Sequence, residues 1–303
     1  MGEAHPASRA SHGTGGTNDP CLNRHGSPVL STFRASDGYS FYFRRYLPPG
    51  VPRAGLVFLH GIRSHGGWYT RSCAAFAAAG FEVFFLDRRG AGLNTAHRGD
   101  TPSFRRLLDD VAEFVQALRG DRAWLPVFAC GISWGGKLAV GLTYRKPGLV
   151  DGLVLLCPGL APKIAPPLPR RLRIALARAL RPDRHFAIPL NEPKLFTASP
   201  GGQKFIDADP HGLRRATARF LFSSFSLDIY LKRAAKRVTV PTMLTLAEHD
   251  RIIDNAKTRA FVAQFAGEVT VIGYPGAHHT LEFEPPDHPW VGDVVRWVDA
   301  RIG

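Results

Sequence analysis

Six short apolar runs are the feature that most constrains how this chain folds. Each is five to seven residues long, and turn residues or helical patterns separate one run from the next. Strands that are apolar on both faces and alternate with helices are typical of a parallel sheet covered by helices on both sides. The runs are GLVFLH (55–60), FEVFFLD (81–87), PVFAC (126–130), GLVLLC (152–157), PTMLTLA (241–247) and EVTVIG (268–273). The sequence therefore predicts an α/β protein with a mostly parallel central sheet.

Three further patterns complete the expected sheet and its helices. The stretch FRASDGYSFYFRRYLP (33–48) alternates on both sides of an Asp-Gly pair, which is a β-hairpin signal, and we expect this hairpin to open the sheet. An apolar stripe runs through 102–118, where Thr101 can cap a helix and Pro102 suits its first turn. A last amphipathic helix is expected at 291–298.

The strand rhythm stops between 158 and 236. This segment reads as helices joined by proline-rich loops, and an insertion of this size between two parallel strands predicts a cap over the carboxyl edge of the sheet. The expected organisation is a disordered tail (1–30), the first part of the core (31–157), a helical cap after the sixth strand (158–236) and the second part of the core (237–303).

The composition argues against several classes of protein. No run of about 18 apolar residues suggests a membrane-spanning helix, and the N-terminus lacks the apolar centre of a secretory signal. Four cysteines without ligand spacing indicate free, mostly buried thiols in a cytoplasmic protein. The net charge of +14 rests mainly on 31 arginines. Such charge can serve nucleic-acid binding, but we expect attraction to an anionic surface instead, and no nucleic-acid partner.

The stretch GISWGG (131–136) places Ser133 in a Gly-x-Ser-x-Gly pattern. The pattern follows the run PVFAC and precedes a helical stretch, and this strand-turn-helix setting is what a nucleophile elbow requires. A Cβ at Gly131 or Gly135 would strike the neighbouring strand or helix, which explains both glycines. The simpler interpretation is an ordinary small turn. The setting favours Ser133 as a nucleophile.

Two later loops supply the groups that a nucleophilic serine needs. A histidine must take the hydroxyl proton, and a carboxylate must orient that histidine. Asp250 follows the fifth apolar run, and His278 and His279 follow the sixth, so that the order is serine, aspartate, histidine. Asp254 and Glu282 are the alternative carboxylates.

Two backbone N–H groups should also face the oxygen that becomes charged in the tetrahedral intermediate. Trp134 supplies one of them, because it follows the nucleophile at the start of a helix. The other is expected in the loop after the first apolar run, where the N–H of Ile62 follows His60 and Gly61.

With these motifs the chain resembles proteins of the α/β-hydrolase fold. Within that fold it is similar to the monoacylglycerol lipase-like and lysophospholipase-like serine hydrolases, which are also grouped with serine aminopeptidases. The resemblance extends from about residue 31 to the end. It rests on HGIRSHGGWY (60–69), DRRGAGLN (87–94), GISWGG (131–136), AEHDRIID (247–254) and GAHHTLEFE (276–284). It implies cleavage of carboxylic esters through an acyl-enzyme on Ser133.

The resemblance also distinguishes between the two histidines. In the family the residue that precedes Thr-Leu, here His279, is the general base, and His278 is then a neighbouring loop side chain. His60 and His65 resemble residues that shape the oxyanion loop, or in the simpler interpretation are structural hydrogen-bonding groups. The chain departs from better-studied members mainly at 158–236, the segment that selects the substrate, so the fold alone does not name it.

Three functions follow from these patterns. The first is hydrolysis of monoacylglycerol-like or lysophospholipid-like esters. The second is an aminopeptidase or amidase, which predicts acidic cap side chains for the substrate's amino group; the cap is instead rich in arginine and apolar residues, with Glu192, Asp207 and Asp209 as exceptions. The third is a non-catalytic binding protein, but such proteins usually lack a triad or oxyanion residue.

No metal-ligand spacing or phosphate-binding lysine motif is present, so no cofactor or metal is expected, and Lys137 is assigned to the surface or to helix packing.

The stretch PLPRRLRIALARALRP (167–182) predicts a helix that is apolar on one side and basic elsewhere. In one interpretation the apolar side packs on the core and the arginines are solvated. In the other it lines the acyl pocket, and the arginines hold the cap against an anionic membrane surface. The apolar side comprises Leu172, Ala175, Leu176, Ala179 and Leu180. No pattern in the sequence bears on the oligomeric state.

Overall fold

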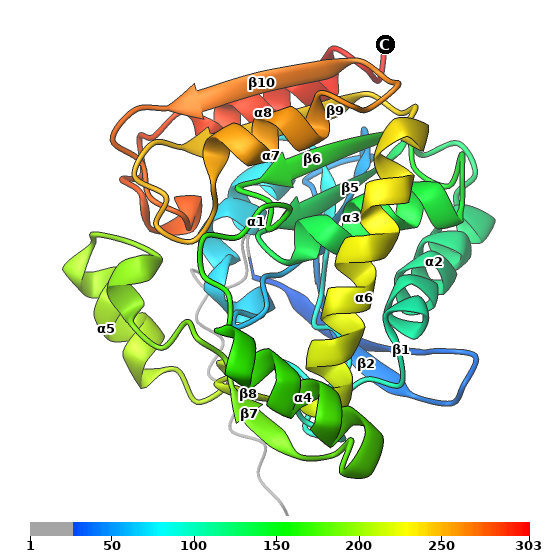
Figure 1. Cartoon of the computed structure of the whole chain (residues 1–303). Coiled ribbons are helices and arrows are strands. Elements are labelled where there is room, and N and C mark those ends of the chain that lie inside the picture. The colour runs from blue at the N-terminus through cyan, green and yellow to red at the C-terminus, as the bar shows by residue number, and fades with distance from the viewer. Residues whose placement is uncertain (1–26) are drawn as a thin grey trace, which may run out of the picture.

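The computed structural model describes residues 27–303, which form an eight-stranded central sheet (Figure 1). Its strands are β1 (Val29–Arg34), β2 (Ser40–Tyr46), β3 (Gly55–Leu59), β4 (Glu82–Leu86), β5 (Val127–Ile132), β6 (Gly152–Leu156), β9 (Thr242–Ala247) and β10 (Val269–Tyr274). They lie in the order β1-β2-β4-β3-β5-β6-β9-β10. The hairpin β1–β2 and the pair β2–β4 are antiparallel, and the other pairs are parallel. The expected α/β-hydrolase arrangement of the sheet is confirmed.

The hairpin that opens the sheet turns through Ala35–Tyr39. The N–H of Ala35 donates to the carbonyl of Tyr39 at 2.8 Å, and Gly38 has a φ of +83°, which favours glycine. Strand β1 already begins at Val29, whereas the core was expected from residue 31. The rest of the expected tail, residues 1–26, lies outside the described part of the chain.

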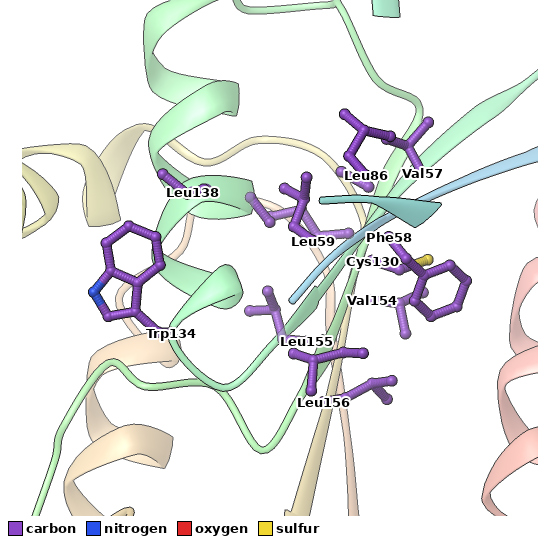
Figure 2. Packing of buried hydrophobic residues seen from close by; sticks show 14 of the residues in the cluster. Val57, Phe58, Leu59, Leu86, Cys130, Trp134, Leu138, Val154, Leu155 and Leu156 are labelled. Carbon is purple, nitrogen blue, oxygen red and sulfur yellow. The ribbon is translucent and has the colours of Figure 1, made fainter. Parts of the chain in front are cut away.

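Helices cover both faces of the sheet (Figure 1). On one face Phe58 stacks on Phe76 of α1 with ring centroids 5.5 Å apart, and α1 packs against α8. Strand register places Phe58, Cys130 and Val154 side by side on this face, on the side of the strands away from Trp134 and Leu138 in Figure 2. Helices α2 and α3 cover the opposite face. The helices outside the insertion are α1 (Thr70–Ala78), α2 (Phe104–Asp121), α3 (Gly135–Arg145), α7 (Asn255–Val262) and α8 (Trp290–Asp299), with the 3₁₀ turns η1 (Gly66–Trp68) and η4 (Leu281–Phe283).

The expected capping of α2 by Thr101 was wrong. The helix begins at Phe104, and the hydroxyl of Ser103 accepts a hydrogen bond from the N–H of Arg106 at 3.1 Å. The backbone of Ser103 is still extended, so the helix cannot start earlier. The Thr101 hydroxyl donates instead to the carbonyl of Ser103 at 3.2 Å. Ser103 is therefore the N-cap.

The insertion between β6 and β9 follows the sixth strand, as expected. In Figure 1 its helix α6 crosses in front of α3, and α5 lies on the side where the arrowheads of β6 and β10 end. The insertion also contains a small antiparallel sheet that was not expected, because strands of three residues are too short to show an alternating pattern. The elements of the insertion are α4 (Leu168–Leu180), β7 (His185–Ala187), η2 (Pro193–Leu195), α5 (Pro200–Ala208), β8 (Arg215–Thr217), α6 (Ala218–Ala234) and η3 (Ala235–Arg237).

Helix α4 packs by a different side from the one expected. Ile174 and Ala177, three residues apart and so on one side of the helix, are buried against Phe186 and Ala218. The leucines, in contrast, are between 62% and 69% exposed, at Leu168, Leu172, Leu176 and Leu180. The leucine side neither packs on the core nor lines a pocket, so both interpretations of its packing were wrong. Within residues 27–303, no helix is long and apolar enough to cross a membrane.

Candidate active site

Ser133 lies in the turn between β5 and α3, at the carboxyl edge of the sheet. Its φ of +51° is in the left-handed region, which is uncommon for a residue with a Cβ and marks a strained turn. The N–H of Ser133 donates to the carbonyl of Leu156 at 3.0 Å, and its own carbonyl accepts from Gly136 at 2.9 Å and Gly159 at 2.6 Å. These bonds hold the strained turn, and the half-buried side chain stays within reach of a substrate.

Glycines surround this turn because the backbones lie unusually close. A Cβ on Gly135 would lie 2.0 Å from the carbonyl oxygen of Leu59, and one on Gly131 would lie 2.5 Å from the Cα of Gly136. At Gly61, in the loop after β3, a Cβ would lie 3.3 Å from the Cβ of Ser133. The expected steric reason for the glycines is therefore observed at atomic level.

The structure brings Ser133, His279 and Asp250 into one hydrogen-bonded chain. The Nε2 of His279 lies 2.9 Å from the Oγ of Ser133, and its Nδ1 lies 2.7 Å from Oδ2 of Asp250. A carboxylate only accepts, so Nδ1 carries the proton and Nε2 is free to accept the proton of the serine hydroxyl. This is the arrangement of a general base beside a nucleophile.

Asp250 is held as a carboxylate. Burial by itself raises its pKa, but the His279 ring and the N–H groups of Ile252 and Ile253 outweigh burial and lower the pKa below its ordinary value. Both N–H groups donate to Oδ1 at 2.8 Å. Asp250 is therefore negatively charged at neutral pH, as a residue that orients a histidine must be.

The two alternative carboxylates and the second histidine lie away from the Ser133 hydroxyl. Asp254 caps α7 by accepting from the N–H of Lys257 at 3.0 Å. Glu282 is buried at the N-terminus of α1, where it accepts from two backbone N–H groups. The backbone N–H of His278 donates to Glu284 at 2.7 Å, and its ring lies 3.3 Å from the same carboxylate. None of these three side chains takes part in the hydrogen-bonded chain at Ser133.

The two expected oxyanion donors flank Ser133. Trp134 follows it at the start of α3, and Ile62 follows Gly61 in the loop after β3. In the part of the chain that the structure describes, neither N–H has an acceptor. The indole Nε1 of Trp134 donates to the hydroxyl of Ser224 at 2.8 Å, which joins the turn to α6 of the insertion.

His65 joins the loop after β3 to the insertion. Its Nδ1 accepts from the N–H of Gly67 at 3.1 Å, so the protonated Nε2 faces the Asp209 carboxylate at 3.2 Å. Trp68 donates to the same carboxylate at 2.7 Å. Burial raises the pKa of Asp209, but the bonds from His65 and Trp68 outweigh it and lower the pKa well below its ordinary value. This role of Asp209 could not be predicted from the sequence, because its partners lie about 140 residues away.

The insertion also reaches the catalytic histidine candidate. The ring of Phe196 lies 6.1 Å from that of His279, and the carbonyl of Phe196 accepts from the N–H of Thr280 at 2.9 Å.

Lys137, at the start of α3, is buried against α6, with its Nζ 2.5 Å from Asp228. It is a helix-packing residue, one of the two expected alternatives. Among residues 27–303, no group of three or more His, Cys, Asp or Glu side chains could hold a metal ion.

Two cavities lie beside the loop that carries His278, and Ser133 lines neither of them. One cavity of about 710 Å³ lies between η1, the insertion and the loop that follows His279, and its apolar lining includes Trp68, Phe205 and Phe283. Ser133 does not line it. The cavity therefore lies beside the histidine loop, apart from the nucleophile candidate.

Comparison with known proteins shows the family and the relatives that this chain resembles. The family described as serine aminopeptidase, S33, matches residues 50–286. The monoacylglycerol lipase of Mycolicibacterium smegmatis is 28% identical over 280 residues, which cover 89% of this chain and 97% of that lipase. Human monoglyceride lipase is 26% identical over 275 residues, which cover 88% of this chain and 89% of that lipase. The crystal structure of Paleococcus ferrophilus monoacylglycerol lipase superposes with a TM-score of 0.77 at 23% identity, covering 86% of this chain and 99% of that one, which shows a shared fold.

We predict that Gly135→Ala destabilises the fold, because its Cβ would lie 2.0 Å from the Leu59 carbonyl oxygen. The expected loss in the free energy of unfolding is about 3 kcal/mol, measured by chemical denaturation. Gly120→Ala is the matched control: it lies in α2, where an added Cβ meets nothing within 4 Å, and should gain up to about 1 kcal/mol. Equal stability of the two variants would contradict the close approach.

Proposed function

This chain belongs to the serine aminopeptidase S33 family within the α/β hydrolases, and from that membership we propose that it hydrolyses monoacylglycerol-like lipid esters with Ser133, His279 and Asp250 as its triad. The observation that carries the proposal is the hydrogen-bonded chain from the Ser133 hydroxyl through His279 to a charged carboxylate. Relatives named as monoacylglycerol or monoglyceride lipases, aligned along most of their length, support the choice of substrate.

The geometry suits acyl transfer in two steps. Oγ of Ser133 attacks the ester carbonyl carbon while Nε2 of His279 takes the hydroxyl proton, and the carboxylate of Asp250 stabilises the imidazolium. The N–H groups of Ile62 and Trp134 would donate to the carbonyl oxygen as it becomes negative. When the C–O bond breaks, His279 returns its proton to the leaving alcohol. Water, activated by the same histidine, then releases the fatty acid from Ser133.

Residues of the insertion favour an ester over a peptide with a free amino group. We assign 158–236 as a cap over the core formed by 31–157 and 237–303. Asp209, a buried carboxylate of this cap, already accepts from His65 and Trp68. Asp228 pairs with Lys137, and Glu192 pairs with Lys194. The cap side chain beside His279 is aromatic. These contacts support an apolar acyl group at the site and argue against an aminopeptidase.

A substrate panel tests this function. We expect medium-chain monoacylglycerols or lysophospholipids to be cleaved with a higher kcat/KM than acetyl esters, and aminoacyl amides to be cleaved slowest, because an apolar site binds an acyl chain by burial. Initial rates with each class give the ranking. A preference for aminoacyl amides would point to the peptidase, and no turnover with any substrate would point to a binding protein.

Substitution of the two adjacent histidines tests the triad. His279→Ala and Ser133→Ala should each lower kcat by up to about 10⁶-fold, and Asp250→Asn by about 10⁴-fold. His278→Ala is the matched control, because its ring pairs with Glu284, and it should keep most of the activity. Labelling of Ser133 by a fluorophosphonate probe gives an independent readout. Loss of activity in His278→Ala and its retention in His279→Ala would overturn the assignment.

The outward side of α4 supports binding to an anionic bilayer. Its leucines form an exposed stripe with i, i+4 spacing. Successive helical residues are about 100° apart, which places Arg173 on one side of this stripe and Arg171 and Arg178 on the other. An apolar stripe between basic side chains suits the interface of a membrane that carries anionic lipids.

We also assign the protein to the cytoplasm, because Cys73, Cys130 and Cys157 are buried, free thiols.

Co-sedimentation with vesicles tests the membrane contact. Replacing Arg173 and Arg178 with Gln should weaken binding to phosphatidylglycerol vesicles at low salt by about 30-fold, since each arginine contributes about 1 kcal/mol. Leu172→Ser with Leu176→Ser should weaken binding at any salt concentration. Val51→Ser, another exposed apolar position, is the control and should bind like the wild type. Each variant should hydrolyse a water-soluble ester normally. Absence of wild-type binding at low salt would refute the contact.

A further inference from the structure

Arg88 is a buried residue beside the oxyanion loop that takes no part in the hydrogen-bonded chain of Ser133, His279 and Asp250. It follows β4 and Asp87 at the carboxyl edge of the sheet and is 8% exposed. Among the described residues its side-chain hydrogen-bond partners are uncharged, and its Nε has none. A buried cation that lacks a carboxylate costs free energy, so its presence calls for an explanation.

The guanidinium holds two consecutive carbonyl groups of the oxyanion loop. Its Nη1 donates to the carbonyl of Gly61 at 2.9 Å, and its Nη2 donates to that of Ile62 at 2.6 Å. The backbone N–H of Arg88 donates to Nε2 of His60 at 3.0 Å, so the ring proton of His60 lies on Nδ1. That Nδ1 lies 2.7 Å from the Gly61 carbonyl. The Gly61 oxygen thus accepts from both side chains.

We propose that Arg88 is the positioning residue of the oxyanion hole, fixing the Gly61–Ile62 peptide so that the Ile62 N–H faces the substrate oxygen. In a trans peptide the C=O and the following N–H point in opposite directions, and no cis peptide occurs among residues 27–303. Holding the Gly61 oxygen on one side therefore directs the Ile62 N–H to the other. Donation to that oxygen also polarises the peptide and strengthens its N–H as a donor. This inference rests on the proposed function.

The same guanidinium contacts the residue that supplies the second donor. The Cζ of Arg88 lies 5.1 Å from the ring centroid of Trp134 and 5.4 Å from that of Phe220. A planar guanidinium can donate in its plane to two carbonyls while its face stacks on a ring, which an ammonium group cannot do. Burial lowers the pKa of Arg88 to about 9, so the side chain is still protonated at neutral pH. Arg88 thus contacts both halves of the oxyanion hole.

Substitution of Arg88 and its neighbour Arg89 tests this role. Arg89 is buried as deeply, but its guanidinium binds Asp110 and Asp37, and within residues 27–303 it makes no hydrogen bond to the oxyanion loop. We expect Arg88→Met to lower kcat by about 100-fold, the usual effect of losing one oxyanion donor, with KM nearly unchanged. Its affinity for a trifluoromethyl ketone, which forms a charged tetrahedral adduct on Ser133, should fall by a similar factor. Arg89→Met should lower the melting temperature but keep the wild-type kcat per active site.

Active-site titration with a fluorophosphonate separates loss of function from loss of folded protein. A folded Arg88→Met enzyme with wild-type kcat and inhibitor affinity would overturn the inference, as would an equal loss of kcat per site in Arg89→Met. If Arg88→Met does not fold, Arg88→Lys decides: it keeps the charge but reaches one carbonyl, so kcat should fall about 10-fold, and a wild-type kcat would refute the role. A wild-type enzyme without esterase activity, or full activity in Ser133→Ala, would refute the proposed function instead.

Discussion

The close approach of the Leu59 carbonyl to Gly135 is the constraint on which the site depends. Only glycine allows α3 to begin this near the end of β3, and the turn before it then has to place Ser133 at positive φ. The same approach brings Gly61 beside the serine, and with it the loop that carries Ile62. One backbone contact between the end of β3 and the start of α3 thus places Ser133 and the oxyanion donors that we propose.

Parallel strands supply the rest of the site without any close approach. The loops that follow β3, β5, β9 and β10 all leave the same edge of the sheet, which is how residues 146 positions apart come within hydrogen-bond distance. The register that aligns Phe58, Cys130 and Val154 on one face also fixes where each of their strands ends, so the packing in Figure 2 sets the position of the loops.

The sequence predicted those parts of the molecule that local pattern determines. Short apolar runs identified the parallel strands, and the chain order of Ser133, Asp250 and His279 matched three residues that the fold brings together. The features that the sequence did not predict depend on contacts with distant parts of the chain. The pair β7–β8 is too short to have a pattern, and the buried side of α4 is set by α6 rather than by its own leucines. The role of Arg88 could not be predicted, because a charged residue after a strand usually faces solvent, and only the fold places its guanidinium against two carbonyl groups.

The hydrogen bond between the Trp134 indole and Ser224 has a consequence for how substrate preference can diversify in this fold. Trp134, which we propose as an oxyanion donor, is thereby bound to α6, so a change in the position of α6 would also move Trp134. The exposed leucine side of α4 is under no such restriction, whereas Phe196 and Asp209 tie the segments on both sides of α5 to the site. New specificities should therefore accumulate around α4, and a grafted insertion would need to bring a hydroxyl to the position of Ser224 or lose rate.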